Sequence, residues 1–338
     1  MKIVDMHCDT VSVMLEKRRA GEAVTLRENH GHLDLNRMKE SGYLLQNFAL
    51  YVDKGSCVDP WDEVCDLYEV YRQEISANED IIAEVLKYDD IVINQKMGKL
   101  SSMLTVEEGA VCKGDIEKLK KLYDMGVRML TLTWNYQNEL GSPNVDKVAK
   151  AMAQDAGENT VHYSFKPNTS QGLTDRGREF VTEMERLGMI IDVSHLSDAG
   201  FYDVLECTHK PFVASHSNAR SICRHVRNLT DDMIRKLAER GGCMGLNYYA
   251  DFLTEGTNGG YGGIEAMVQH AKHITDIGGM EVLGLGSDFD GIDTNRELPG
   301  VQGMELLWNA LHKGGFTQGE LDKIFYQNVL RVYRDCLI

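Results

Sequence analysis

The stretch Ile3-Val4-Asp5-Met6-His7-Cys8-Asp9-Thr10 decides how the rest of this chain is interpreted. A short β-branched run leads straight into a His-x-Asp pair, a few residues from the first methionine. Side chains two positions apart on a strand point the same way, so His7 and Asp9 are expected to converge at one strand end. An imidazole and a carboxylate placed together are typical ligands of one metal ion. The stretch therefore predicts a strand that ends in a metal site, for which the remaining chain must supply further ligands.

Size and composition limit the class of protein. The chain has 338 residues, of which 43% are hydrophobic and 26% charged, as in ordinary globular proteins. Its net charge of -16 argues against nucleic acid or an anionic membrane surface as a partner. We find no signal-peptide pattern and no run of roughly 18 apolar residues, and we therefore expect a cytoplasmic protein without a membrane span. The eight cysteines are scattered without a C-x-x-C pair, which indicates reduced thiols.

Short, continuously apolar runs recur along the chain, which is typical of strands that are covered on both faces. The expected strands are Ile3–Met6, Leu44–Leu50, Ser102–Val106, Arg128–Leu132, Met189–Val193, Phe212–Ala214, Cys243–Leu246 and Val282–Gly286. Eight strands that alternate with helices predict a (β/α)8 TIM barrel rather than an open doubly wound sheet. No G-x-G-x-x-G motif or P-loop follows a strand, which argues against nucleotide binding. Because no linker or repeat divides the chain, we expect residues 1–338 to form a single domain.

Three longer segments interrupt this alternation and are expected as insertions at the C-terminal face of the barrel, where active sites lie. They are the acidic, mostly helical Asp53–Leu100, the partly helical Asn135–Thr174, and the Gly-rich Glu255–Gly263. Helix ends are also marked in the sequence. The signals are Gly188 after an amphipathic stretch from Thr174 to Leu187, a cap at Thr230 with Gly241-Gly242 closing that helix, and a capping box of Thr317 with Glu320.

Side chains that can bind metal follow several of the predicted strands. They are His7, Asp9, Glu107, Glu108, His195, His216 and Asp288. In a parallel barrel the C-terminal ends of all strands meet at one rim. The carboxylates gathered at this rim would repel one another unless cations were bound between them. Histidine and carboxylate without thiolate suit zinc or a similar divalent ion. The groups outnumber what one tetrahedral zinc ion with an open position needs, whereas two ions bridged by one carboxylate would use them all.

These residues lie in motifs that resemble the membrane (renal) dipeptidase family of the amidohydrolase superfamily, in its soluble bacterial form. The motifs run in order along the whole chain: Asp5-Met6-His7-Cys8-Asp9, Leu130-Thr131-Leu132-Thr133-Trp134-Asn135, Gly188-Met189-Ile190-Ile191-Asp192-Val193-Ser194-His195, Ser215-His216-Ser217, Arg227-Asn228 and Gly286-Ser287-Asp288-Phe289-Asp290-Gly291. The resemblance implies two zinc ions per chain, one held by His7 and Asp9 and the other by His195 and His216. Glu107 and a water or hydroxide would bridge them. The family's Val-Glu pair favours Glu107 as the bridge, and Glu108 is expected to be a turn or supporting residue.

The resemblance also implies roles in catalysis and substrate binding. The metal-bridging hydroxide would be the nucleophile, with Asp288 as general acid and base. Arg227 would bind the terminal carboxylate of a dipeptide through its guanidinium fork. Where the renal enzyme's pattern has a substrate-binding histidine, this chain has Trp134, whose indole donates one hydrogen bond but cannot carry a proton. Stabilisation of the oxyanion would then rest on zinc alone or on another group such as His162.

We therefore expect a zinc-dependent dipeptidase whose partners are small dipeptides. Whether it accepts a C-terminal D-residue and whether it forms a homodimer are left open. One alternative is another amidohydrolase on the same site, such as an N-acyl-amino-acid hydrolase or a lactonase. A second alternative, of a different class, is a catalytically silent metal-binding scaffold. Such a protein would tend to lose Asp288 or a metal ligand, and here all of them are present.

Overall fold

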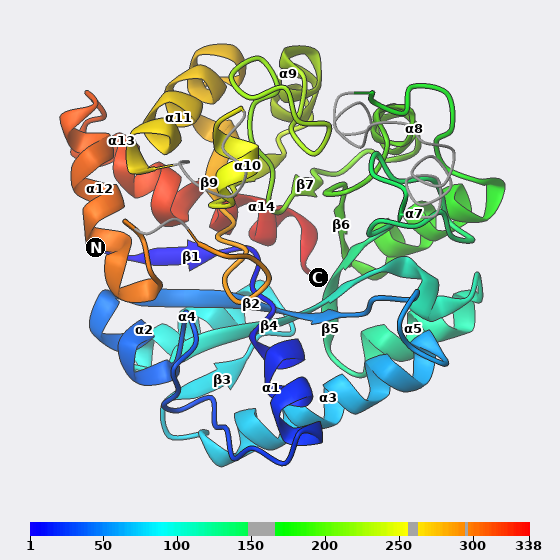
Figure 1. The fold of residues 1–338 in the computed structure, drawn as a ribbon, viewed down its shortest axis with the longest axis horizontal. Coiled ribbons are helices and arrows are strands. Elements are labelled where there is room, and N and C mark those ends of the chain that lie inside the picture. Colours follow the sequence, from blue (N-terminus) through cyan, green and yellow to red (C-terminus); the bar gives the residue numbers. More distant parts are fainter. Residues whose placement is uncertain (148–165, 256–262, 295–296) are drawn as a thin grey trace.

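The computed structural model describes residues 1–147, 166–255, 263–294 and 297–338. Within these ranges nine parallel strands form one sheet, and all of them except β3 close a barrel (Figure 1). The barrel strands are β1 (Ile3–Asp5), β2 (Tyr43–Tyr51), β4 (Leu100–Glu107), β5 (Val127–Thr131), β6 (Ile190–Asp192), β7 (Val213–Ala214), β8 (Cys243–Leu246) and β9 (Leu283–Leu285). β1 pairs with both β2 and β9, and the pairing of β2 with β4 closes the ring. The predicted (β/α)8 barrel is confirmed.

The segment Asp53–Leu100, expected to be mostly helical, contains a strand that the sequence did not reveal. Helices α3 (Pro60–Ala77) and α4 (Tyr88–Lys96) flank β3 (Ile82–Glu84), which pairs with residues 100–102 of β4. β5 pairs with β4 only from Leu104 onward, so the first residues of β4 have an open edge on that side. β3 occupies this edge and satisfies its backbone hydrogen bonds. In the other two insertions, residues 148–165 and 256–262 lie outside the described residues.

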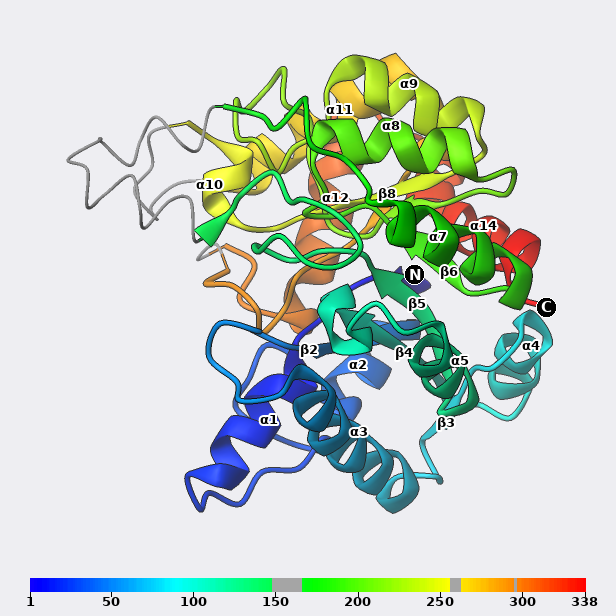
Figure 2. The same ribbon diagram turned by 90° about the vertical axis from the view of Figure 1, so that its right-hand side faces the viewer.

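Helices surround the barrel, as the two perpendicular views in Figures 1 and 2 show together. Besides α3 and α4 they are α1 (Thr10–Arg19), α2 (Leu35–Ser41), α5 (Ile116–Asp124), α7 (Asp175–Leu187), α8 (Asp198–Cys207), α9 (Asp231–Glu239), α10 (Ala250–Leu253), α11 (Ile264–Gly278), α12 (Met304–Lys313), α13 (Gln318–Asp322) and α14 (Asn328–Cys336). Among the described helices, none combines the length and the apolar character needed to cross a membrane.

The expected helix ends are present. The Thr174 side chain caps α7, which ends at Gly188 in the left-handed conformation with a φ of 77°. Thr230 caps the start of α9, and the predicted glycine pair ends it, since Gly241 directly follows the C-cap residue Arg240 in the left-handed conformation with a φ of 75°. Thr317 and Glu320 form the predicted capping box of α13. Local hydrogen bonding is thus sufficient to set these boundaries.

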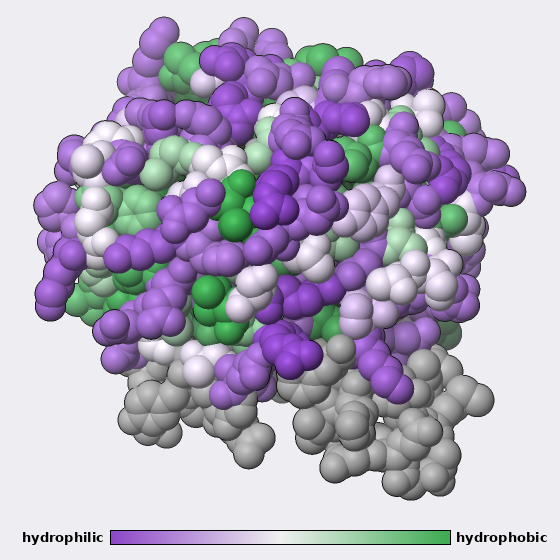
Figure 3. Space-filling view, turned by 90° about the horizontal axis from the view of Figure 1, so that it is seen from above, coloured by the Kyte–Doolittle hydropathy of each residue, from purple (hydrophilic) through white to green (hydrophobic). Residues whose placement is uncertain are grey.

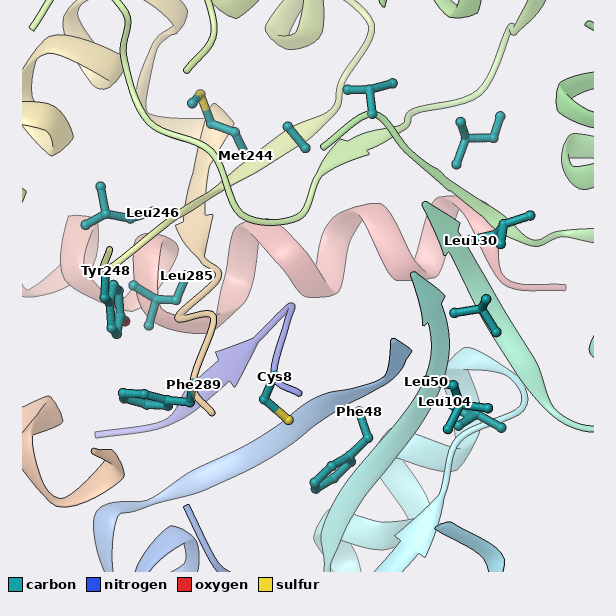
Figure 4. Packing of buried hydrophobic residues seen from close by; sticks show 14 of the residues in the cluster. Cys8, Phe48, Leu50, Leu104, Leu130, Met244, Leu246, Tyr248, Leu285 and Phe289 are labelled. Carbon is teal, nitrogen blue, oxygen red and sulfur yellow. The ribbon is translucent and has the colours of Figure 1, made fainter. Parts of the chain in front are cut away.

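Alternation along the strands decides which side chains face into the barrel. On β4, Leu104 and Val106 pack in the apolar layer between strands and helices, part of which Figure 4 shows around Leu104 and Leu130. Met103 belongs instead to a second cluster, which takes its members from many strands and from α14. These members include Val4, Leu45, Met129, Ile190, Val213, Cys243, Val329 and Tyr333. Since side chains alternate, Glu107 projects to the same side as Met103, into the barrel at its C-terminal end.

The face seen in Figure 3 is largely hydrophilic, with apolar residues in small separate areas. This agrees with the high proportion of charged residues in the chain. The eight cysteines are all unpaired, and Cys8, Cys112, Cys223, Cys243 and Cys336 are buried. The expectation of free thiols is confirmed.

Candidate metal centre

Glu107, the last residue of β4, lies between two groups of potential ligands. Its Oε2 is 3.2 Å from Nε2 of His7, whereas its Oε1 is 3.0 Å from Nε2 of His195 and 3.6 Å from Nε2 of His216. The carboxylate is almost completely buried, and burial raises its pKa to about 7. One oxygen therefore faces each group, which is the arrangement that a carboxylate bridging two cations requires.

The first group follows β1 and β9. Nε2 of His7 is 3.4 Å from Oδ2 of Asp9 and 3.8 Å from Oδ1 of Asp288. Ligand atoms of these three buried residues lie within 4.8 Å of one another, and so do those of His7, Glu107 and His216. The structure thus brings together residues that are nearly the whole chain apart in sequence, as the shared rim of a barrel predicts.

The second group consists of His195, just after β6, and His216, just after β7. Their Nε2 atoms are only 3.1 Å apart. The opposite ring nitrogens are held elsewhere: Nδ1 of His195 lies 2.9 Å from Oδ1 of Asn135, and Nδ1 of His216 lies 2.8 Å from the hydroxyl of Ser215. Burial lowers the pKa of both imidazoles well below the ordinary value. Both rings are therefore neutral at pH 7 and direct their Nε2 atoms toward Glu107.

Bound divalent metal ions explain the distances between these side chains better than hydrogen bonds between the side chains do. Two Nε2 atoms 3.1 Å apart can share at most one proton. Within the described ranges, both ring nitrogens of His7, Oδ1 of Asp9 and Oε1 of Glu107 are buried without a hydrogen-bond partner, which is costly unless a cation is present. Tetrahedral zinc with ligand bonds of about 2.0–2.1 Å separates its ligands by about 3.3 Å. The distances around Glu107, from 3.0 to 3.6 Å, agree with this separation.

Asp288 lies three residues after β9 in a left-handed conformation with a φ of 63°. Its Oδ2 accepts a hydrogen bond of 2.9 Å from the side-chain amide of Asn247. Burial raises the pKa of Asp288, while the neighbouring imidazole of His7 opposes this effect. His195 and Glu108 also have positive φ, at 68° and 106°. Non-glycine residues held in this conformation are uncommon and often mark functional sites.

Arg227 is buried close to this centre, with 4% of its surface exposed. Its Nη2 donates to the carbonyl oxygen of His216 at 3.3 Å, and its guanidinium lies 5.4 Å from the ring centre of Phe252. Its Nε has no hydrogen-bond partner, and no carboxylate lies within 4 Å of the guanidinium, in the part of the chain that is described. Burial lowers the pKa of Arg227 to about 10. The arginine therefore remains charged at pH 7 and has donors available for an anion.

A cavity of about 820 Å³ opens above part of this centre, whereas His7, His216 and Arg227 are not among the residues that line it. Asp9, Glu107, His195 and Asp288 lie in its wall, which also contains four aromatic side chains, Tyr51, Trp134, Tyr249 and Phe252, and further acidic residues such as Asp53 and Asp290. Trp134 thus faces the cavity, with its ring centre 6.2 Å from that of His195. His162, the other residue considered for substrate binding, lies outside the described residues. The cavity has room for a molecule larger than a few water molecules.

Glu108 points away from the metal ligands. Its carboxylate accepts hydrogen bonds from the backbone nitrogens of Ala110, at 2.9 Å, and Trp134, at 3.3 Å, as well as from the side chain of Asn138. It therefore holds the turn after β4 and the start of the loop that carries Trp134. This is the supporting position that the sequence suggested for Glu108.

Two residues at the site were assigned no role from the sequence. Asn135 orients His195 and lines the cavity, and Asn247 holds Asp288. Asn247 directly follows β8, and Asn135 lies a few residues beyond β5. A search that included amides as well as charged residues after each strand would have found both.

Comparisons with known proteins agree with this geometry. The family model described as membrane dipeptidase (peptidase family M19) matches residues 1–336. An uncharacterized protein encoded in the pqqA 5′ region of Klebsiella pneumoniae is 31% identical over 82% of this chain and 97% of its own length. An uncharacterized dipeptidase of Schizosaccharomyces pombe is 28% identical over 98% of this chain and 80% of its own length.

Solved structures show the same similarity. A metallopeptidase from Rhodobacter sphaeroides, in complex with a phosphinate mimic of the dipeptide L-Ala-D-Ala, superposes with a TM-score of 0.89 and 25% identity over 99% of each chain. A structure described as a dipeptidase and metallopeptidase of family M19 has a TM-score of 0.88 and 26% identity, and covers 100% of this chain and 99% of its own.

Proposed function

Because this chain belongs to the membrane dipeptidase family, peptidase family M19, we propose that it is a dipeptidase that uses two zinc ions. The observation that carries the number of ions is the position of Glu107. One of its oxygens lies beside His7 and the other beside His195 and His216. In this proposal His7 and Asp9 hold one ion, His195 and His216 hold the other, and Glu107 bridges them.

Zinc bound here would lower the pKa of a bound water toward neutrality and would polarise the scissile carbonyl group. The chain provides the surroundings for this chemistry. The candidate ligands are buried side chains, and several of them line the base of the cavity, so charges there interact strongly. The neutral rings of His195 and His216 present lone pairs, as metal ligands must.

Asp288 is proposed as the general acid and base. Its carboxylate lies beside His7 and Asp9 and faces the cavity, where it could take a proton from the attacking water and pass it to the leaving amine. A raised pKa brings a carboxyl group closer to the operating pH, which favours this exchange. The hydrogen bond from Asn247 fixes one carboxylate oxygen and leaves the other free to act.

Arg227 is proposed to bind the terminal carboxylate of the dipeptide. A buried guanidinium without an ion pair among the described residues gains most from an anionic ligand. The dipeptide mimic in the Rhodobacter sphaeroides structure is built on L-Ala-D-Ala. We therefore propose that this chain also accepts a D-residue at the C-terminal position.

A panel of substrates tests the proposal. Purified protein should contain close to two zinc ions per chain and release amino acids from L-L and L-D dipeptides, with activity lost after chelation and restored by zinc. The same panel should include N-acyl amino acids and lactones. Turnover of one of these without dipeptide hydrolysis would replace the dipeptidase proposal with the other amidohydrolase reading, and zinc binding without any turnover would favour a metal-binding scaffold.

A further inference from the structure

Asp192, the last residue of β6, has a fully buried carboxylate that accepts four hydrogen bonds next to the His195–His216 pair. Its Oδ1 accepts from the backbone nitrogens of Ser194 and Ser215, at 3.0 and 2.8 Å. Its Oδ2 accepts from the hydroxyls of Thr131 and Ser215, both at 2.6 Å. Two N–H and two O–H donors on two oxygens match an ionised carboxylate, which only accepts.

Strand alternation explains why these side chains meet. Met129, Ile190 and Val213 belong to the cluster inside the barrel. Two residues further along each strand, Thr131, Asp192 and Ser215 therefore face the same interior, and Thr131 is directly paired with Asp192 in the strand register. They form a polar layer between the apolar interior and the metal ligands.

The hydrogen bonds of this layer determine which nitrogen of His216 carries a proton. The hydroxyl of Ser215 has a single proton, which it donates to Asp192. Toward Nδ1 of His216, 2.8 Å away, the same oxygen can then only accept. His216 must therefore carry its proton on Nδ1, which leaves the lone pair of Nε2 facing Glu107. The Ser194 hydroxyl completes the network, since it accepts from the backbone nitrogen of His216 at 3.1 Å and lies 3.2 Å from Oγ of Ser215.

We propose that Asp192 and Ser215 are positioning residues for one of the two metal ions. Through the Ser215 hydroxyl, Asp192 fixes the tautomer and ring orientation of His216; through its other oxygen it holds the turns that carry His195 and His216. Such outer contacts raise ligand basicity and metal affinity. This inference rests on the proposed two-metal site.

Asp192 and Ser215 should affect the binding affinity of only one of the two metal ions. The turn that carries His7 is held by a different carboxylate, because Oδ1 of Asp5 accepts from the backbone nitrogens of His7, at 3.2 Å, and Ser287, at 2.9 Å. Among the described residues, the hydrogen bonds of Asp192 reach Thr131 and the turns of the second group of ligands, and none reaches the turn that carries His7. A defect in the Asp192–Ser215 pair should therefore weaken the ion at His195 and His216 and spare the ion at His7 and Asp9.

The test compares Ser215→Ala, Ser215→Thr and Ser217→Ala in the full chain. Ser217 is the matched control, because it directly follows His216, is equally buried, and has a hydroxyl without a hydrogen-bond partner among the described residues. Asp192→Asn addresses the same pair, but it disturbs four hydrogen bonds and is the variant most apt to misfold. Ser215→Ala therefore decides the question, with thermal melting of the metal-free proteins as a check on folding.

Zinc content and affinity are measured by competition with a chromophoric chelator, and the imidazole Nδ1–H of His216 is followed by proton NMR. Ser215→Ala should bind one of two zinc ions about 10- to 100-fold more weakly, the usual effect of losing such a contact, and should lose the protected Nδ1–H signal. Ser215→Thr should retain most of the affinity, and Ser217→Ala should match the wild type.

Equal zinc affinities in Ser215→Ala and the wild type would overturn the inference. So would equal weakening of both ions, or the same loss in Ser217→Ala, because either result would indicate a general structural effect. Failure of the wild type to bind two zinc ions would instead overturn the proposed function, so the two failures are distinguishable.

Discussion

Replacing Arg227 with methionine should separate substrate binding from protein stability. The variant keeps most of the apolar stem of the side chain and removes the guanidinium. If Arg227 binds the terminal carboxylate, the variant loses a buried, charge-assisted pair with its substrate. Truncating one partner of such a pair costs about 2–5 kcal/mol, which corresponds to a fall in kcat/KM of roughly 30-fold to several thousand-fold.

Although Arg227→Met should lower kcat/KM, it should leave the free energy of unfolding unchanged or raise it slightly. Burial lowers the pKa of Arg227 to about 10. At pH 7 the group is charged in both the folded and the unfolded chain, and a fall of this size destabilises the folded protein by about 3 kcal/mol. The one described hydrogen bond of the guanidinium, to His216, returns about 1.5–3 kcal/mol. Unfolding of the Arg227→Met variant in urea should therefore cost the same free energy as in the wild type or up to about 2 kcal/mol more.

A dipeptide and its C-terminal amide make the assay specific for the carboxylate. The wild type should discriminate strongly between them, whereas Arg227→Met should hydrolyse both at similar low rates. Arg224→Met is the matched control, since Arg224 is exposed three residues earlier in the same loop and should leave this discrimination unchanged. Discrimination that survives in Arg227→Met would refute the assigned role. A large loss of stability would refute the energetic reasoning.

Three further variants test other parts of the site. Asp288→Asn should retain both zinc ions by elemental analysis and lose at least about 100-fold in kcat, the usual contribution of a general acid or base; an active variant would remove Asp288 from the mechanism. Glu107→Gln should weaken both ions in chelator competition because it removes the shared charge, whereas Glu108→Gln should retain both, and the reverse pattern would contradict the proposed bridge. Burial raises the pKa of Asp5 to about 6, so its charged form destabilises the fold. In chelator-treated protein, stability should fall as the pH rises from about 4 to 6, and Asp5→Asn should gain about 1–3 kcal/mol over the wild type at pH 7 but little below pH 4. Equal gains at both pH values in urea titrations would refute that assignment.

The sequence by itself predicted the barrel and placed the candidate metal ligands after its strands. Continuous apolar runs and helix caps are local signals, and they set the positions of β1, β2 and the other barrel strands to within a few residues. The closed parallel topology then requires that residues such as His7, His195 and Asp288 share one rim, because all strands end on the same side. For this reason the sequence alone groups residues that are far apart along the chain.

Other properties were decided only by the tertiary structure, because they depend on contacts between distant segments. β3 pairs with the edge of β4 that β5 leaves open, and this contact depends on how the strands are arranged in the barrel. Strand alternation in the folded barrel turns Glu107 inward and leaves Glu108 to hold the turn after β4. The burial of Arg227 without an ion pair in the described chain, and the four hydrogen bonds that converge on Asp192, likewise arise from packing across neighbouring strands. The sequence identifies the candidate ligands, whereas the packing around them determines which oxygens, tautomers and charges they present to one another.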